Sequence, residues 1–182
     1  MKTLETERLI LRTWEPEDVN DLYEYAKDPR VGPIAGWASH KSIDESMLIL
    51  KSCIENDNSW AIELKDCKKV IGMVKIHPDE NRGKYYAKLI NYALSPAYWG
   101  NGYMTEALKR VVDYAFDELK VDLLSVFHYP QNVRSKRVIE KCGFEYEGII
   151  EKGCMRYDGQ LFDAVCYSIL KDDWMKRKDV ES

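Results

Sequence analysis

The sequence predicts an α/β fold, a single domain over residues 1–182 in which a mixed sheet carries helices on both faces. Three observations support this prediction. Short segments alternate apolar and polar residues, as half-buried strands do. Longer segments carry an apolar stripe at helical spacing. Strands come first as hairpins, and the second half of the chain then alternates strands with helices, which favours parallel neighbours in that half.

The first part of the chain is predicted to hold one strand and two helices. Over residues 8–13, Leu9, Leu11 and Thr13 alternate with Arg8, Ile10 and Arg12, which predicts the first strand. Pro16 stands among acidic residues, so we expect a helix to begin there. Prolines and glycines recur over residues 29–40, which are therefore expected to form an irregular loop. Ser42 can cap a second helix over about residues 42–55.

The remaining elements follow from the same patterns. Further strands are predicted at residues 60–64, 70–76, 86–94, 123–129, 144–150 and 162–170. Two amphipathic helices separate the later strands, one ending near Leu119 and one over residues 132–142.

Composition limits the class of function. The formal net charge is −4, which disfavours nucleic acid or an anionic membrane as a partner. No apolar run in the sequence is long enough to span a membrane. The five cysteines are scattered and form no CxxC pair, so we expect reduced thiols, no bound metal and a cytoplasmic protein.

The most informative segment is residues 95–107, where two glycines precede an amphipathic helix. Gly100 and Gly102 would open this helix on unpaired backbone N–H groups at the positive end of its dipole. Such a turn binds phosphate without requiring a particular side chain. A dinucleotide fingerprint would need glycine in place of Thr105, and no P-loop triplet follows. The turn alone fits either a phosphate-bearing cofactor or a structural strand-to-helix turn.

A second motif spans residues 132–144. Asn132 can cap a helix that Gly143 is placed to end, so capping and packing would explain each residue taken alone. The joint pattern is more specific. Asn-x-x-Ser-x-x-Val-x-Glu-Lys-x-Gly-Phe, following Trp-Gly-x-Gly-Tyr-x-Thr-Glu-Ala, resembles the GNAT superfamily of acetyl-CoA-dependent N-acetyltransferases. Within it, the opening residues 5–12 and the closing residues 157–170 also resemble the branch that acetylates ribosomal-protein N-termini (RimJ/RimL-like).

The resemblance implies a GNAT-like, mostly antiparallel seven-stranded sheet whose parallel fourth and fifth strands splay apart around coenzyme A. It also implies the cofactor-binding residues, which are Tyr92, Ala93 and Leu94 on the fourth strand, Gly100, Asn101, Gly102, Tyr103, Met104 and Thr105 in the turn, and Asn132. Trp99 and Met104 depart from the general pattern of the pyrophosphate loop. We interpret Trp99 as a packing residue, and capping remains the alternative role of Asn132.

The reaction implied is direct attack of a primary amine on the thioester of acetyl-CoA in a ternary complex. Many members carry a tyrosine that protonates the leaving thiolate, and Ile139 stands at that position here. Ser135 is therefore the candidate catalytic acid, with a helix-start role as the alternative. No general base is assigned among the candidates His77, His128, Glu151 and Asp163.

The acceptor amine is the least determined part of this prediction. A protein N-terminus and a small-molecule amine both remain open, as does a homodimer. We expect the loop at 29–40, the second helix and the segment 151–163 to select the acceptor. The absent tyrosine and the unassigned base leave a non-catalytic acyl-CoA-binding sensor as the alternative function.

Overall fold

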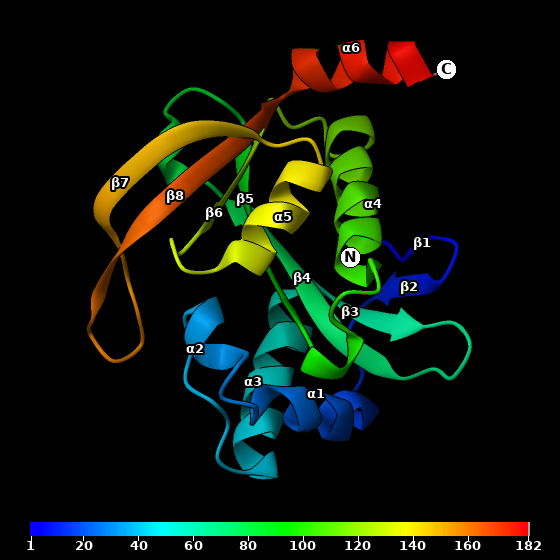
Figure 1. The fold of residues 1–182 in the computed structure, drawn as a ribbon. Coiled ribbons are helices and arrows are strands. Elements are labelled where there is room, and N and C mark those ends of the chain that lie inside the picture. Colours follow the sequence, from blue (N-terminus) through cyan, green and yellow to red (C-terminus); the bar gives the residue numbers. More distant parts are fainter. Residues whose placement is uncertain (182) are drawn as a thin grey trace.

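The computed structural model describes residues 1–181, in which eight strands form one mixed sheet in the order β1-β2-β3-β4-β5-β6-β8-β7 (Figure 1). The strands are β1 (Leu4–Glu5), β2 (Leu9–Arg12), β3 (Ser59–Leu64), β4 (Val70–Pro78), β5 (Ala87–Leu94), β6 (Leu123–His128), β7 (Glu145–Met155) and β8 (Leu161–Leu170). The predicted count of seven strands is wrong by one. Strand β1 has two residues, too few for an alternating pattern to show, and pairs antiparallel with β2.

The sheet opens between β5 and β6. These two strands are parallel, and the other described pairs are antiparallel. Pairing between β5 and β6 runs only from Ala87 opposite Leu123 to Leu89 opposite Ser125. Strand β5 continues to Leu94 and β6 continues to His128, so the second halves of both strands diverge. The predicted splay of a parallel pair is confirmed.

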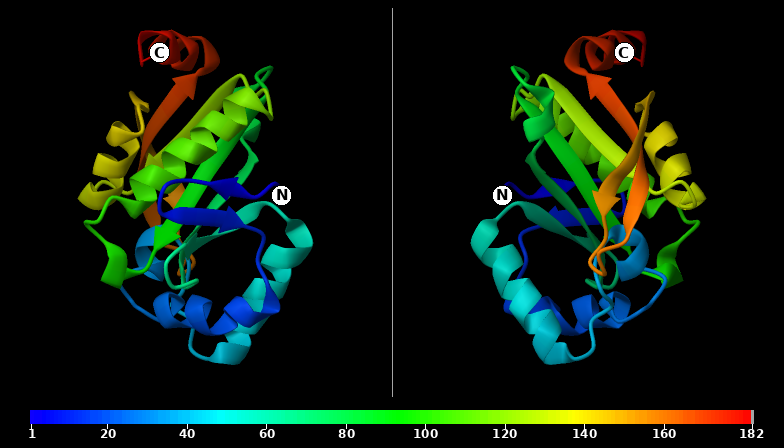
Figure 2. Two further views of the ribbon diagram at one scale, coloured as in Figure 1. Left: turned by 90° about the vertical axis from the view of Figure 1, so that its right-hand side faces the viewer. Right: turned by 90° about the vertical axis from the view of Figure 1, so that its left-hand side faces the viewer.

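Helices cover both faces of the sheet. They are α1 (Val19–Ala26), α2 (Gly32–Ala35), α3 (Ile43–Asn56), α4 (Tyr103–Asp117), α5 (Val133–Lys141) and α6 (Lys171–Glu181). Trp60 and Ile62 of β3 pack in the core with the buried stripe of α4, whereas Ala61 between them packs with α1 and α3. Figure 2 shows α1 and α3 side by side at the end of the molecule opposite α6. The alternation of strand residues therefore divides the core in two.

Two helical elements differ from the sequence-based expectations. The loop predicted at 29–40 contains the one-turn helix α2, which begins at Gly32, has Pro33 in its first turn and ends before Gly36, which has a left-handed conformation. Helix α6 is absent from the prediction because its residues show no apolar stripe. Tertiary contacts hold α6 instead: the Trp174 ring stacks on Phe116 at 5.2 Å between centroids, and its indole nitrogen donates to Asp113.

Element boundaries differ in smaller ways. The first helix is preceded by a 3-10 turn over Pro16–Asp18 with a capping box. The strand predicted at 144–150 continues to Met155 through a register shift. All five cysteines are free thiols. Within residues 1–181, no helix has the length and apolar character needed to cross a membrane.

Candidate active site

The glycine turn has the backbone geometry that the sequence suggested. Gly100 and Gly102 have φ values of +82° and +81°, a region that side chains disfavour, and Gly102 is the residue before α4. No side chain among the described residues caps this end of α4. The first intrahelical bond comes from the Glu106 N–H to the Gly102 carbonyl, so the N–H groups of residues 103–105 are free to meet an anion.

Two residues near the start of the sequence, Thr6 and Arg8, bind the first turn of α4 through Glu106, and we call these three residues the clamp. Glu106 accepts hydrogen bonds from Thr6 Oγ1 at 2.6 Å, from the Arg8 N–H at 2.9 Å and from Arg8 Nε at 2.7 Å. Arg8 also donates to the Asn101 carbonyl at 3.1 Å and lies 4.3 Å from the Tyr103 ring centroid. Burial alone would raise the pKa of Glu106, but the bonds from Thr6 and Arg8 bring that pKa below its ordinary value.

Sequence analysis missed this clamp, although both of its parts lie inside quoted motifs. Thr6 and Arg8 belong to the opening motif, and Glu106 belongs to the motif around the glycines. The signal was a pair of opposite charges in two motifs, but only the sheet order brings them together. The clamp joins the start of β2 to the first turn of α4, and so fixes the glycine turn relative to the sheet.

Trp99 does more than pack. Its ring packs against both core clusters, as expected for a packing residue. Its indole nitrogen also donates to the Leu94 carbonyl at 2.8 Å, and the Arg134 guanidinium carbon lies 4.5 Å from the ring centroid. Trp99 therefore joins the end of β5 to the start of α5 across the mouth of the splay.

The unpaired edge of β5 supplies backbone groups to the splay. The Ser95 N–H donates to the Ile71 carbonyl of β4, so Ser95 turns its backbone groups toward β4. The Tyr86 carbonyl accepts from the Asp122 N–H beside β6, so the backbone groups of alternate residues along β5 point to β4 and to β6 in turn. By this alternation Tyr92 and Leu94 turn their backbone groups toward β6, beyond the last paired position. The Leu94 carbonyl is taken by Trp99, which leaves the Tyr92 groups and the Leu94 N–H on the open side.

The start of α5 forms the opposite wall. Asn132 caps the helix, because its Oδ1 accepts from the Ser135 N–H at 3.1 Å. The Ser135 hydroxyl oxygen lies 2.6 Å from the phenol oxygen of Tyr92. Burial raises the pKa of the Tyr92 phenol above its usual value, although the bond with Ser135 opposes that shift. Ile139 has a hydrocarbon side chain that can donate no proton, and it is fully buried in the core.

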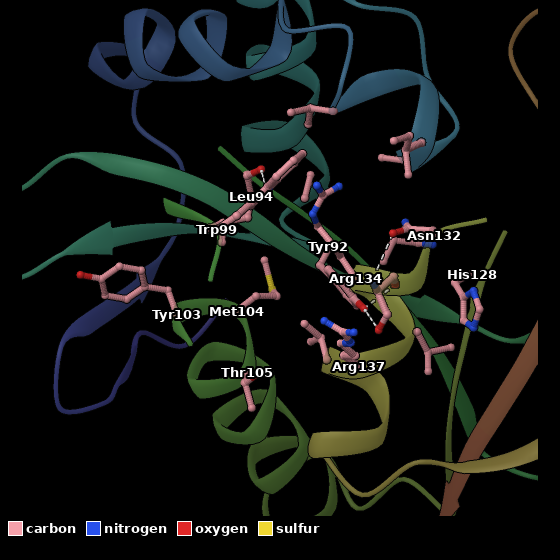
Figure 3. A pocket seen from close by; sticks show the side chains of 18 of the residues that line it. Tyr92, Leu94, Trp99, Tyr103, Met104, Thr105, His128, Asn132, Arg134 and Arg137 are labelled. Carbon is pink, nitrogen blue, oxygen red and sulfur yellow. Dashed lines mark hydrogen bonds between the residues drawn. The ribbon is translucent and has the colours of Figure 1, made fainter. Parts of the chain in front are cut away.

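A cavity of about 490 Å³ lies between these walls (Figure 3). In Figure 3 the labelled residues of α4, such as Met104 and Thr105, lie on one side, and Asn132, which caps α5, and Arg137 lie on another. The predicted site residues that line the cavity are Tyr92, Ala93, Leu94, Gly100, Gly102, Tyr103, Met104, Thr105, Asn132 and Ser135. Asn101 does not line it: its side chain turns back to the carbonyls of Tyr98 and Trp99.

The charges around the cavity have one sign. Arg30, Arg134, Arg137 and Lys141 line it, and no Asp or Glu does so within the described part of the chain. A cationic lining suits the phosphates of an anionic ligand. Among residues 1–181, no cluster of three or more His, Cys, Asp or Glu side chains is arranged to hold a metal ion.

The four candidate bases lie in different surroundings. His77 Nε2 is bonded to Asn91 Oδ1 at 2.8 Å, and Asp163 accepts from the Lys152 N–H at 2.9 Å. Glu151 is exposed on β7. His128 alone of the four lines the cavity, where its Nδ1 lies 2.7 Å from the Tyr129 carbonyl and its Nε2 is buried without a protein partner.

Fold and site together define an acyltransferase: a splayed parallel pair, a glycine turn opening a helix, and a second helix start facing it. Comparison with known proteins agrees. Residues 8–145 match the family model described as the acetyltransferase (GNAT) domain, so the chain belongs to the GNAT acetyltransferase family and is an N-acetyltransferase.

Relatives cover nearly the whole chain. It is 28% identical over 92% of its length to YoaA of Bacillus subtilis, named as an N-acetyltransferase, covering 96% of that protein. It is 29% identical over 92% of its length to the ribosomal protein uS5 alanine N-acetyltransferase of Escherichia coli, covering 78% of that protein. A GNAT-family acetyltransferase from Bacillus anthracis superposes with a TM-score of 0.80 at 23% identity, over 94% of this chain and 99% of that one.

Proposed function

We propose that this protein transfers the acetyl group of acetyl-CoA to the α-amino group of a protein N-terminus, by direct attack in a ternary complex. One observation carries the proposal. The glycine turn, the open edge of β5 and the start of α5 all line a single cavity between the splayed strands. Each part supplies one of the needs of a thioester reaction, which are an anion site, a backbone edge and a hydroxyl group.

The chain's residues fit coenzyme A at this place. The free N–H groups of residues 103–105 would bind the pyrophosphate, because helix N-termini bind anions through their backbone. The open groups of Tyr92 would bind the amide-containing arm, as a strand edge binds an extended peptide. Bound acetyl-CoA supplies the thioester that the amine attacks. Ser135, at the start of α5, would hold the proton that the departing sulfur takes.

The cavity favours a peptide acceptor over a polyamine. Its charged lining consists of Arg30, Arg134, Arg137 and Lys141, and no carboxylate within residues 1–181 lines it. A polyamine needs carboxylates to balance its charges, whereas an N-terminal peptide presents one amine on a neutral backbone. The similarity to the uS5 alanine N-acetyltransferase supports the same choice.

Four aromatic side chains take no part in lining the cavity. None of Trp37, Tyr85, Tyr157 and Phe162 lines the cavity in the described part of the chain. Tyr85 and Tyr157 are exposed, and Trp37 packs on His40. Residues of α2, such as Ile34, line the cavity instead, together with Phe127 of β6 and Tyr129 directly after that strand.

A thiol-release assay with a matched acceptor panel tests this proposal. We expect turnover with acetyl-CoA and peptides beginning with Ala or Ser, and none with the same peptides carrying a blocked N-terminus. Spermidine should be a poorer acceptor than the peptides. Titration calorimetry with acetyl-CoA, and with a form lacking the adenosine phosphates, measures binding separately. Tight cofactor binding without turnover of any amine would contradict the proposal and support the acyl-CoA sensor instead.

A further inference from the structure

A tyrosine from β5 reaches the first turn of α5 across the splay. The Tyr92 phenol oxygen is 2.6 Å from Ser135 Oγ and 3.3 Å from the Ser135 carbonyl oxygen. Tyr92 is partly buried, and both residues line the cavity. The contact joins β5 to the first turn of α5, which form two walls of the cavity. It therefore lies in the cavity where the reacting atoms of the proposed reaction would meet.

The contact between the two hydroxyl groups can form in either direction, and the two directions leave different hydrogens available to the cavity. The phenol and the serine hydroxyl each carry one hydrogen, and each oxygen can also accept. Asn132 Oδ1 accepts from the Ser135 N–H, whereas the Ser135 hydroxyl lies against the Tyr92 phenol. When Tyr92 donates along the 2.6 Å contact, the hydroxyl hydrogen of Ser135 is left for a third group in the cavity.

We propose that Tyr92 is a positioning residue that donates a hydrogen bond to Ser135 Oγ and leaves the serine proton for the departing sulfur. This inference rests on the proposed acetyl transfer. In that step the amine nitrogen bonds to the thioester carbon, and the carbon–sulfur bond breaks with its electron pair on sulfur. Sulfur takes the Ser135 hydroxyl proton. The nitrogen releases one proton to water, and Ser135 recovers one from water, so Tyr92 keeps its own proton.

The hydrogen bond from Tyr92 is worth more in the transition state than before it. As Ser135 gives up its proton, negative charge develops on Oγ, and a bond to a charged acceptor is about twice as strong as a neutral one. Burial raises the pKa of Tyr92, so the phenol remains a donor at neutral pH. Tyr92 on β5 would thus support proton transfer in a chain where Ile139 replaces the tyrosine of the second helix.

Kinetics of Tyr92→Phe provide the first test. We expect kcat to fall by about tenfold to a hundredfold, because a hydrogen bond to a charge-bearing group is lost. The Kd of acetyl-CoA should not change. In a Ser135→Ala background, adding Tyr92→Phe should cause no further loss, because the two residues act as a unit. Tyr114→Phe removes a tyrosine hydroxyl from a buried residue of α4, away from the cavity, and is the matched control. An equal loss in both backgrounds would overturn the proposal.

The second test needs no turnover. Protein labelled with 3-fluorotyrosine gives a fluorine resonance for Tyr92, assigned by its absence in Tyr92→Phe. We expect Ser135→Ala to shift this resonance in the free protein and to leave that of Tyr114 in place. An unmoved Tyr92 resonance would overturn the contact. Absence of acetyl transfer by the wild-type protein would refute the proposed function instead, and thermal unfolding of each variant excludes loss of fold as the cause.

Discussion

Replacing Gly102 by alanine should weaken acetyl-CoA binding more than it weakens the fold. Gly102 has φ +81°, and a Cβ built there would meet Arg8 Nη2 at 3.6 Å, which is an ordinary contact. The protein should therefore fold. A left-handed alanine costs about 1–2 kcal/mol, which corresponds to a fall in Tm of roughly 2–8 °C for a chain of this size.

The affinity for acetyl-CoA should fall for a separate reason. Residues 103–105 line the cavity directly after Gly102, and as the first turn of α4 they have no acceptor for their N–H groups within the helix. A methyl group and a relaxed backbone would displace these donors, and losing one hydrogen bond to a phosphate costs about 1.5–3 kcal/mol. We therefore expect the Kd of acetyl-CoA to rise by about tenfold to a hundredfold.

A matched control separates the two effects. Gly159 lies in the turn between β7 and β8, has the same φ of +81°, and would place a Cβ in open space. Gly159→Ala should cost similar stability and leave the Kd of acetyl-CoA unchanged. Calorimetric titration gives Kd, and thermal unfolding gives Tm. Equal affinities for the two variants would refute the assignment of the glycine turn to the cofactor.

Three further predictions concern residues that line the cavity or support its glycine turn. Ser135→Ala should lower kcat and kcat/KM together by about tenfold to a hundredfold with acetyl-CoA affinity retained; steady-state kinetics would contradict the acid role if affinity fell while kcat held. Glu106→Gln should cost about 1–3 kcal/mol at neutral pH, because it weakens the clamp with Arg8. Because the pKa of Glu106 is lowered in the folded protein, its contribution to stability is present above the ordinary glutamate pKa and is lost as pH falls through the lowered value. The Tm values of the variant and of the wild-type protein should therefore converge in acid. A difference in Tm that stays constant with pH would argue against the clamp. Trp99→Phe removes the 2.8 Å bond to the Leu94 carbonyl and should lower Tm by roughly 2–4 °C, for a loss of about 1 kcal/mol; an unchanged Tm would show that ring packing alone matters.

Local patterns in the sequence determined the elements that build the site. The glycines before α4 are needed for positive φ, and the apolar stripe of α4 matches its buried face. Asn132 caps α5, as its residue type and place predicted. These features depend on residues a few positions apart, so they can be predicted without knowing which distant segments become neighbours. The motifs they form also carried the resemblance to the family.

Only the tertiary structure decided the contacts between distant segments. Arg8 and Glu106 are 98 residues apart, and Tyr92 and Ser135 are 43 apart. Neither pair follows from periodicity or capping, because each depends on which strands become neighbours and where they part. Helix α6 is likewise held by contacts with other segments and not by a stripe of its own. Local geometry depends on neighbouring residues and can be predicted from the sequence. The partner of a polar side chain from a distant segment is decided only when the order of strands in the sheet brings the two segments together.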